Sequence, residues 1–133
     1  MAGKFTELED SLYSLLRTPA FLAENLKVLP NNFVSVITEE FIRLDIATGS
    51  PSYSARSSRG FLIAQIFIKA GIGVRRASVI SDILDKHLMG KSVKGSLGTL
   101  IFTNSTLSHY GVDKANPGLH LSEYTINYSW SNT

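Results

Sequence analysis

Histidines are the residues of this sequence most able to bind a metal or move a proton, and the chain has three of them, His87, His109 and His120. Only His87 has carboxylates nearby at helical spacing, those of Asp82 and Asp85. The surrounding residues place His87 on the apolar stripe of a predicted helix, where a histidine is more often packed and hydrogen-bonded than bound to a metal. The pattern therefore favours a structural role over a metal site.

Short motifs of common enzymes do not occur in the sequence. There is no cysteine, which excludes thiol nucleophiles, thiolate metal sites and disulfides. Neither Gly-x-Ser-x-Gly nor a complete phosphate-binding loop ending in Gly-Lys-Ser/Thr is found, and Gly71-x-Gly73 lacks the third glycine of a dinucleotide-binding turn. Asp82, Asp85 and Lys86 are more typical of a solvated helix face than of an acid–base pair. We predict that the protein is not an enzyme and uses no cofactor or metal.

Basic residues form the second candidate group. Arg75 and Arg76 fall at the start of a predicted helix, where the helix dipole makes cations unfavourable by about 0.3–1 kcal/mol. Either such side chains point into solvent, or they meet carboxylates of a neighbouring subunit or phosphates of DNA. The same alternatives hold for the basic residues of two predicted loops. The candidate residues for a subunit interface or a DNA-facing lumen are Arg56, Arg59, Arg75, Arg76, Lys91 and Lys94.

The composition indicates one ordered domain covering residues 1–133. Hydrophobic residues make up 44% of the chain and charged residues 18%, with a mean hydropathy of +0.08, which suits a subunit of an oligomer. A net charge of +2 is too small for a dedicated nucleic-acid-binding protein. The longest apolar run contains Gln65 and ends at Lys69, too short to cross a bilayer, and the first residues lack the apolar core of a signal peptide. We expect no association with a membrane.

The region from Gly60 to Leu88 has the clearest local pattern. Residues 60–70 are apolar at both odd and even positions, which predicts a central strand covered on both faces. Gly71-Ile72-Gly73 ends this pattern, and from Val74 the apolar residues recur at helical spacing. Gly90 suits the left-handed position that ends such a helix. The sequence therefore predicts a strand, a tight turn and a helix.

Further elements are predicted on both sides of this region. Residues 8–16 form an amphipathic helix with Thr6 as its N-cap, residues 21–29 fit either a helical turn or an extended segment, and residues 33–37 are a possible strand. Strands are expected at residues 41–47, at 99–103 with an extension towards Leu107, and at 119–130. Residues 48–59 and 91–98 are predicted to be long connections, and residues 108–118 a turn region.

The last predicted strand alternates strictly. One face carries an apolar ladder that belongs either to the core or to a surface that contacts a partner, and the other face is hydrophilic. The two sets are Tyr124, Ile126, Tyr128 and Trp130, and Glu123, Thr125, Asn127 and Ser129. Together the elements predict an α+β fold with a single antiparallel sheet, mixed at most, of about four strands and two main helices packed on one of its faces.

These elements together resemble the tail terminator family of long-tailed bacteriophages, over most of the chain. The matching parts are the N-terminal helix, strand 41–47, the small-residue loop, the segment Ser58–Gly73, the helix Ala77–Leu88 and the closing strand to Trp130. The most specific part is an apolar strand that begins with Arg59-Gly60 and ends with Gly71-x-Gly73 before a helix. Residues 33–40 depart from the proline-containing pattern of the family.

The resemblance implies a structural virion protein that forms a ring, expected to have six subunits, on the end of the tail tube. Such a ring stops tube growth and provides a docking surface for the head or neck. The implied partners are further copies of the chain, the tail tube protein and a head-completion or neck protein. DNA would pass through the lumen without sequence-specific binding. The expected location is the tail–neck junction of a virion assembled in the bacterial host cytoplasm.

Three alternatives remain open at the level of sequence. One is a neck or head-to-tail joining protein, which would differ in partner rather than in fold. Another is a basic DNA-binding module that uses Arg56, Arg59, Arg75 and Arg76, with an affinity that falls steeply as salt rises. The last is a small hydrolase or transferase, which needs a pocket containing a perturbed titratable group.

Overall fold

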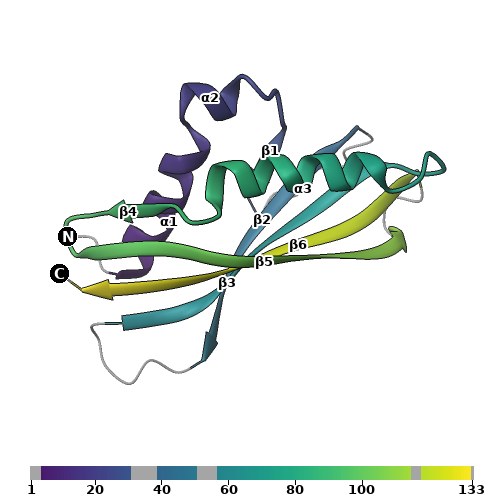
Figure 1. Cartoon of the computed structure of the whole chain (residues 1–133). Coiled ribbons are helices and arrows are strands. Elements are labelled where there is room, and N and C mark those ends of the chain that lie inside the picture. Colours follow the sequence, from purple (N-terminus) through teal and green to yellow (C-terminus); the bar gives the residue numbers. More distant parts are fainter. Residues whose placement is uncertain (1–3, 31–38, 51–56, 115–117, 133) are drawn as a thin grey trace.

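A computed structural model describes residues 4–30, 39–50, 57–114 and 118–132 of the chain (Figure 1). Strands predominate in it. They are β1 (Val28–Pro30), β2 (Phe41–Ser50), β3 (Ser57–Lys69), β4 (Ser92–Lys94), β5 (Gly98–Val112) and β6 (Leu119–Asn132). The helices are α1 (Lys4–Leu16), α2 (Pro19–Leu22) and α3 (Arg75–Leu88).

All six strands form one sheet in the order β1-β2-β3-β6-β5-β4. Neighbouring strands are antiparallel except β1 and β2, which are parallel, so the sheet is mixed. Its long strands twist strongly, and the sheet curls into a half-barrel (Figure 1). The predicted fold of about four strands with two helices packed on one face is therefore wrong, because the chain builds a larger, curled sheet in which strands outweigh helices.

Most of the strand residues that were not predicted lie in segments that were predicted to be loops. β2 continues to Ser50 and β3 begins at Ser57, so much of the predicted connection over residues 48–59 is strand. The predicted flexible connection 91–98 contains β4, and β5 continues to Val112, well beyond Leu107. Small polar residues can pair in a sheet whose face meets solvent, although they produce no apolar periodicity. The possible strand at residues 33–37 lies outside the described residues.

β3 is the central strand that the sequence predicts, since it pairs with β2 on one side and with β6 on the other. Its even-numbered side chains, Leu62, Ala64, Ile66 and Ile68, are almost fully buried. Of its odd-numbered side chains, Phe67 is buried and Phe61 is 39% exposed. The expectation that β3 is covered on both faces is therefore correct only at its C-terminal end.

The main core lies between this even-numbered face of β3 and the helices. α1 and α3 lie on the same side of the sheet (Figure 1), and their apolar stripes pack on it. The buried stripes are Leu8, Leu12 and Leu16 of α1, and Ala77, Ile80, Leu84 and Leu88 of α3. The apolar ladder of β6 faces them: Tyr124, Ile126, Tyr128 and Trp130 are all buried, so this ladder belongs to the core.

Helix ends follow local chemistry. α1 begins at Lys4, so Thr6 lies inside the helix and is not its N-cap. The Thr18 hydroxyl instead caps α2, where it accepts the Phe21 amide proton at 3.2 Å, and Pro19 occupies the first turn. Gly90 follows α3 with φ = 72°, which confirms the predicted left-handed residue after this helix.

Candidate functional site

The sheet face opposite α1 and α3, here called the open face, is not covered by these helices. The predicted hydrophilic ladder of β6 lies on it, since Glu123, Thr125, Asn127 and Ser129 alternate with the buried core ladder. On β3 the odd-numbered side chains lie on the open face, and the even-numbered ones face the helices. The odd-numbered side chains are Phe61, Ile63, Gln65 and Phe67. The open face is therefore a mixed polar and apolar surface of the kind found at protein–protein contacts.

A hollow lies on the open face near the start of β3. It is lined by Arg59, Gly60, Phe61, Thr103, Asn127, Tyr128 and Ser129. Its polar rim is ordered: the Asn127 side-chain amide donates to Asn104 Oδ1 at 2.9 Å, and Thr103 Oγ1 donates to the Asn127 carbonyl oxygen at 3.3 Å. A half-exposed aromatic ring beside an arginine and fixed amides can contact a partner surface, but it lacks the converging titratable groups that acid–base catalysis uses.

The opposite end of this face holds a small second cluster. The rings of Phe41 and Phe67 stack with centroids 4.4 Å apart, and Arg43 lies over Phe67 at 5.3 Å. Arg43 also donates two hydrogen bonds to Gln65 Oε1, at 2.9 and 2.6 Å. These contacts hold the arginine side chain against the sheet.

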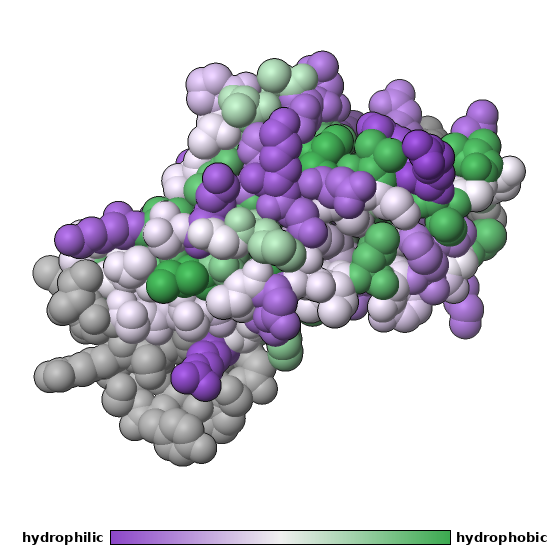
Figure 2. All heavy atoms as spheres, viewed as in Figure 1, coloured by the Kyte–Doolittle hydropathy of each residue, from purple (hydrophilic) through white to green (hydrophobic). Residues whose placement is uncertain are grey.

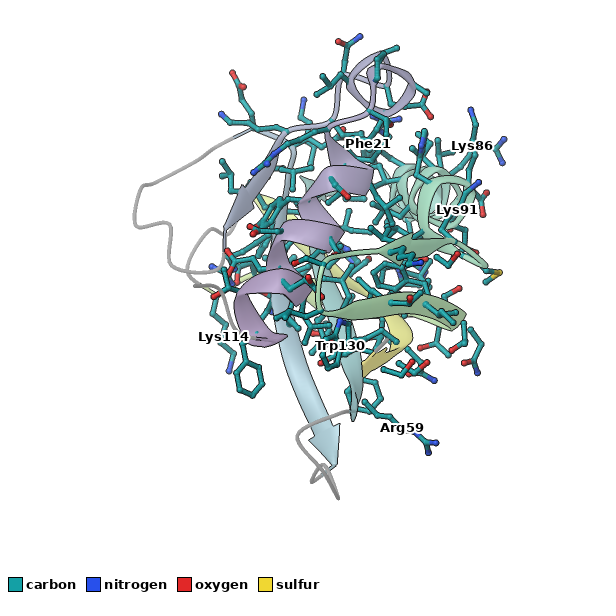
Figure 3. All side chains as sticks on the ribbon, turned by 90° about the vertical axis from the view of Figure 1, so that its left-hand side faces the viewer. Phe21, Arg59, Lys86, Lys91, Lys114 and Trp130 are labelled. Carbon is teal, nitrogen blue, oxygen red and sulfur yellow. The ribbon has the colours of Figure 1, made fainter. Side chains whose placement is uncertain are left out.

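The candidate cations do not converge on one spot. Arg59 is exposed near the start of β3 and points away from the body of the protein (Figure 3), whereas Arg75 is exposed beyond the other end of β3. Residues 59 and 69 of an extended strand are about 33 Å apart. Arg59 and Arg75 therefore cannot belong to one compact binding site within a subunit.

Exposed lysines lie at the Arg59 end of the sheet. The register across β4, β5, β6 and β3 places Lys94, Thr99, Ser131 and Ser57 in one row. Three strand spacings separate β4 from β3, about 14 Å. Lys94 and Lys91 are both exposed. This end of the sheet is therefore the more basic one, with Arg59, Lys91 and Lys94 around it.

The Arg76 side chain forms an ion pair within its own subunit. Its guanidinium donates three hydrogen bonds to the Glu40 carboxylate, at 2.8, 2.9 and 3.2 Å. These hydrogen bonds raise the pKa of Arg76 above its ordinary value. This pairing within the chain compensates for the arginine's unfavourable position at the start of α3, which the sequence left open. Arg56 lies outside the described residues.

The histidines have structural surroundings. His87 is buried, with its ring edge-on to Phe21 at 5.1 Å and its Nε2 3.5 Å from the Glu24 carboxylate. His109 Nδ1 lies 2.7 Å from Ser122 Oγ. Among the described residues, no group of three or more histidine, aspartate or glutamate side chains is arranged to hold a metal ion.

Two buried or half-buried polar clusters join distant parts of the chain, and sequence reasoning missed both. In the first, the Glu7 carboxylate of α1 accepts hydrogen bonds from the Leu97 amide at 2.8 Å, from Ser96 Oγ at 3.0 Å and from Trp130 Nε1 at 3.3 Å. The partners lie about 90 residues or more away, so no local pattern could indicate them. A side chain at Gly95 would collide with this carboxylate, which explains the glycine.

In the second cluster, the Asp85 carboxylate of α3 accepts hydrogen bonds from the hydroxyls of Tyr124 at 2.5 Å and Ser105 at 2.7 Å. Burial, and then the hydrogen bond to Asp85, raise the pKa of Tyr124, so its hydroxyl stays protonated and remains a donor. Both clusters tie a helix to the sheet. They stabilise the scaffold that presents the open face, and they lie on the helix side of the sheet.

Glu7 makes the stability of the fold depend on pH. The Leu97 amide, the largest contribution, lowers the pKa of Glu7 below its ordinary 4.5. A carboxyl whose pKa is lower in the folded state stabilises that state at pH above 4.5, and this contribution is lost as pH falls towards the folded pKa.

We expect Glu7→Gln to lower the melting temperature near neutral pH and to flatten its decline between about pH 5 and about pH 3. Thermal unfolding followed by circular dichroism over this range measures both effects. Glu9→Gln, at an exposed position of the same helix, is the matched control and should leave the profile of the wild type unchanged. A Glu7→Gln profile parallel to that of the wild type would contradict this role of Glu7.

Surface hydropathy on the helix side is mixed: hydrophilic and hydrophobic side chains alternate there without one large apolar area (Figure 2). Within residues 4–30, 39–50, 57–114 and 118–132, no helix has the length and apolar character needed to cross a membrane.

Solved structures with this fold include a chain from the virion of a native gene transfer agent (GTA) particle. The similarity covers 94% of the present chain and 95% of that chain, with a TM-score of 0.63 and 19% sequence identity. Another solved chain matches over 92% of this chain and 88% of its own length, with a TM-score of 0.60 and 19% identity. No protein-family model and no curated protein sequence matches the chain. At this identity the similarity establishes a shared fold.

Proposed function

We propose that the protein is a structural component of a virion. The observation that carries this proposal is the match to the virion chain, which includes helices and sheet together and covers nearly the whole of both chains. The distribution of polar groups agrees with it. The buried Glu7 and half-buried Asp85 carboxylates hold the scaffold together, and the open face is suited to contact another macromolecule.

Within this class, the proposed role is that of a tail terminator. Copies of the chain form a ring, with six subunits expected from the family resemblance, which caps the tail tube and gives the head or neck its docking surface. A ring needs a heterologous contact, in which one surface of a subunit meets a different surface of the next. The described part of the chain offers two distinct surfaces of this kind, the open face and the edge strands of the sheet.

The proposed role of the exposed cations is to face a neighbouring subunit or the lumen. Arg59, Lys91 and Lys94 surround one end of the sheet and Arg75 lies beyond the other end. Cations spread in this way can lower the cost of passing DNA through a ring without reading its sequence, because phosphate contacts carry no sequence information. Arg76 contributes less, since its guanidinium is already paired with Glu40.

The decisive experiment combines the native mass of the purified protein with electron microscopy of the protein mixed with tail tubes assembled without a terminator. We expect rings, and tubes that carry one ring at the end and no longer elongate. Protein that stays monomeric and leaves the tubes bare would contradict the proposal. Rings that bind the head or neck but ignore the tubes would instead identify a head-to-tail joining protein.

Duplex binding separates this role from that of a DNA-binding module. For the ring subunit we expect weak binding to free duplex. Tight binding by the monomer, falling steeply between about 50 mM and about 200 mM salt, would favour the module.

A further inference from the structure

One long edge of the sheet is unpaired in the described part of the chain. β4 pairs only with Thr99, Leu100 and Ile101 of β5, while β5 itself continues to Val112. Figure 1 shows β4 alongside only one end of β5. The side of residues 103–112 that faces away from β6, here called the β5 free edge, therefore has no strand partner among the described residues.

The backbone groups that point out of the β5 free edge follow from the register. Phe102 uses its amide and carbonyl on the β4 side, where its N–H donates to the Lys91 oxygen at 3.0 Å and its oxygen accepts the Gly90 amide proton at 3.2 Å. A bulge lies between Phe102 and Ser105, and regular pairing with β6 resumes at Ser105. Alternation then directs the amides and carbonyls of Ser105, Leu107 and His109 outward.

The chemistry of this edge favours pairing with another strand. Residues 103–112 contain no lysine, arginine, aspartate or glutamate and no proline, the residues that most often protect an edge strand. Tyr110 and Val112 are 63% and 59% exposed at its end. The bulges flanking it curve the strand, but residues 105–109 between them keep a regular register. A regular edge of this composition with outward amides can bind an extended segment through its backbone.

The opposite edge of the same sheet supplies a complementary strand. β1 pairs only with Ile42, Arg43 and Leu44 of β2, so in the described residues the outer side of β2 has no strand partner from Asp45 to Ser50. β2 and β5 run in opposite directions within the sheet. If a second copy has the same orientation as the first, its β2 can lie beside β5 of the first copy. The two strands then run antiparallel. β1 occupies the outer side of β2 at residues 42–44, and β4 occupies that of β5 at residues 99–101. The added pair therefore lies between them, with Asp45 opposite the end of β5 and Ser50 near Leu107.

We propose that the β5 free edge binds the outer edge of β2 in a second copy of this chain, and that repetition of this contact closes the ring. The contact joins two different surfaces, as ring closure requires. The inference rests on the proposed function, because it names the contact from which the ring is built.

A proline at Leu107 tests the contact at the centre of the regular segment. The amide of Leu107 points away from β6, so proline removes no hydrogen bond within the sheet and is tolerated as at other edge positions. Leu107→Ala is the matched control, since it makes a similar loss of packing but keeps the amide. We expect Leu107→Pro to weaken subunit association at least about tenfold relative to Leu107→Ala, measured by mass photometry and sedimentation.

A second pair of variants avoids proline. Thr106 and Thr125 lie opposite each other in register on the open face, but only Thr106 is on the edge of the sheet. We expect Thr106→Lys to reduce association by about tenfold or more, because a lysine protects an edge strand, and Thr125→Lys to reduce it less. A stronger effect of Thr125→Lys would assign the contact to the open face and overturn the edge pairing.

Backbone hydrogen exchange tells whether the β5 free edge forms the contact between subunits. In the assembled protein we expect slow exchange at the outward-pointing amides of Leu107 and His109, and faster exchange in the monomer. Rings in which these amides exchange as in the monomer would overturn the contact and leave the ring in place. Rings with protected amides that ignore tail tubes would overturn the terminator role and leave the contact. A dimer that grows no further would overturn the head-to-tail pairing, and a monomer at every concentration would overturn both proposals.

Discussion

Replacing Trp130 with alanine is expected to lower the free energy of unfolding by about 3–5 kcal/mol, one of the two largest losses predicted for this protein. Trp130 is 2% exposed and packs in the main core, where the last part of β6 faces α1. Its indole nitrogen also donates to Glu7 Oε2 at 3.3 Å. Alanine removes both the packing and the donor, and the carboxylate loses one of the groups that hold it.

Denaturant unfolding of the purified variant measures this loss. Trp130→Phe is the control, because it keeps one aromatic ring in the core while it removes the indole donor and part of the indole volume. We expect Trp130→Phe to lose clearly less stability than Trp130→Ala. Equal losses would show that the ring kept by phenylalanine contributes little, so that the hydrogen bond to Glu7 and the rest of the indole carry the effect.

The parts of the fold that could be predicted from the sequence are those in which burial imposes a pattern. β3 is apolar at both odd and even positions, and the apolar residues of α3 repeat at helix spacing. The turn between them contains Gly71 and Gly73 at φ = 87° and 81°. The alternation of β6 is equally regular, and the structure places its apolar side in the core. In each case the spacing of the apolar residues predicted which side chains share a face; for β6 the structure decided that this face is the core.

The parts that could not be predicted are built from residues without such a pattern. The far half of β5 runs through Thr103, Asn104, Ser105 and Thr106, small polar residues that are equally common in loops. What makes this segment a strand is its pairing with β6, a contact between residues that are distant in sequence. The size and curl of the sheet depend on that pairing. The two strands absent from the predicted sheet, β1 and β4, are three residues long, too short to show a strand period.

In the candidate site, too, features with a local sequence pattern could be predicted and long-range contacts could not. Exposed positions for Arg59, Arg75, Lys91 and Lys94 agree with their polarity, but the sequence contained no sign that Glu40 would pair with Arg76. The Glu7 cluster likewise joins the two ends of the chain. Long-range polar contacts of this kind depend on the completed fold, so they can be located only once the strands have been placed.

The second large effect is expected at Asp85, where alanine should lower the free energy of unfolding by about 2–4 kcal/mol, because hydrogen bonds to charged groups contribute about 1.5–3 kcal/mol each. Asp85 accepts the hydroxyl protons of Tyr124 and Ser105, and Tyr124 is 1% exposed. Without the carboxylate, the buried Tyr124 hydroxyl loses its acceptor and the tie between α3 and the sheet is broken. Denaturant unfolding measures the loss.

Asp82→Ala is the matched control for this prediction, because Asp82 lies one turn earlier on the same helix and is exposed, so its loss should stay within about 0.5 kcal/mol. The decisive variant is Asp85→Ala combined with Tyr124→Phe. If the cost of Asp85→Ala arises mainly from the orphaned hydroxyl, it becomes smaller once that hydroxyl is absent, and a double-mutant cycle reports the difference as a coupling energy. A coupling near zero would contradict the proposed tie and would assign the loss to the helix alone.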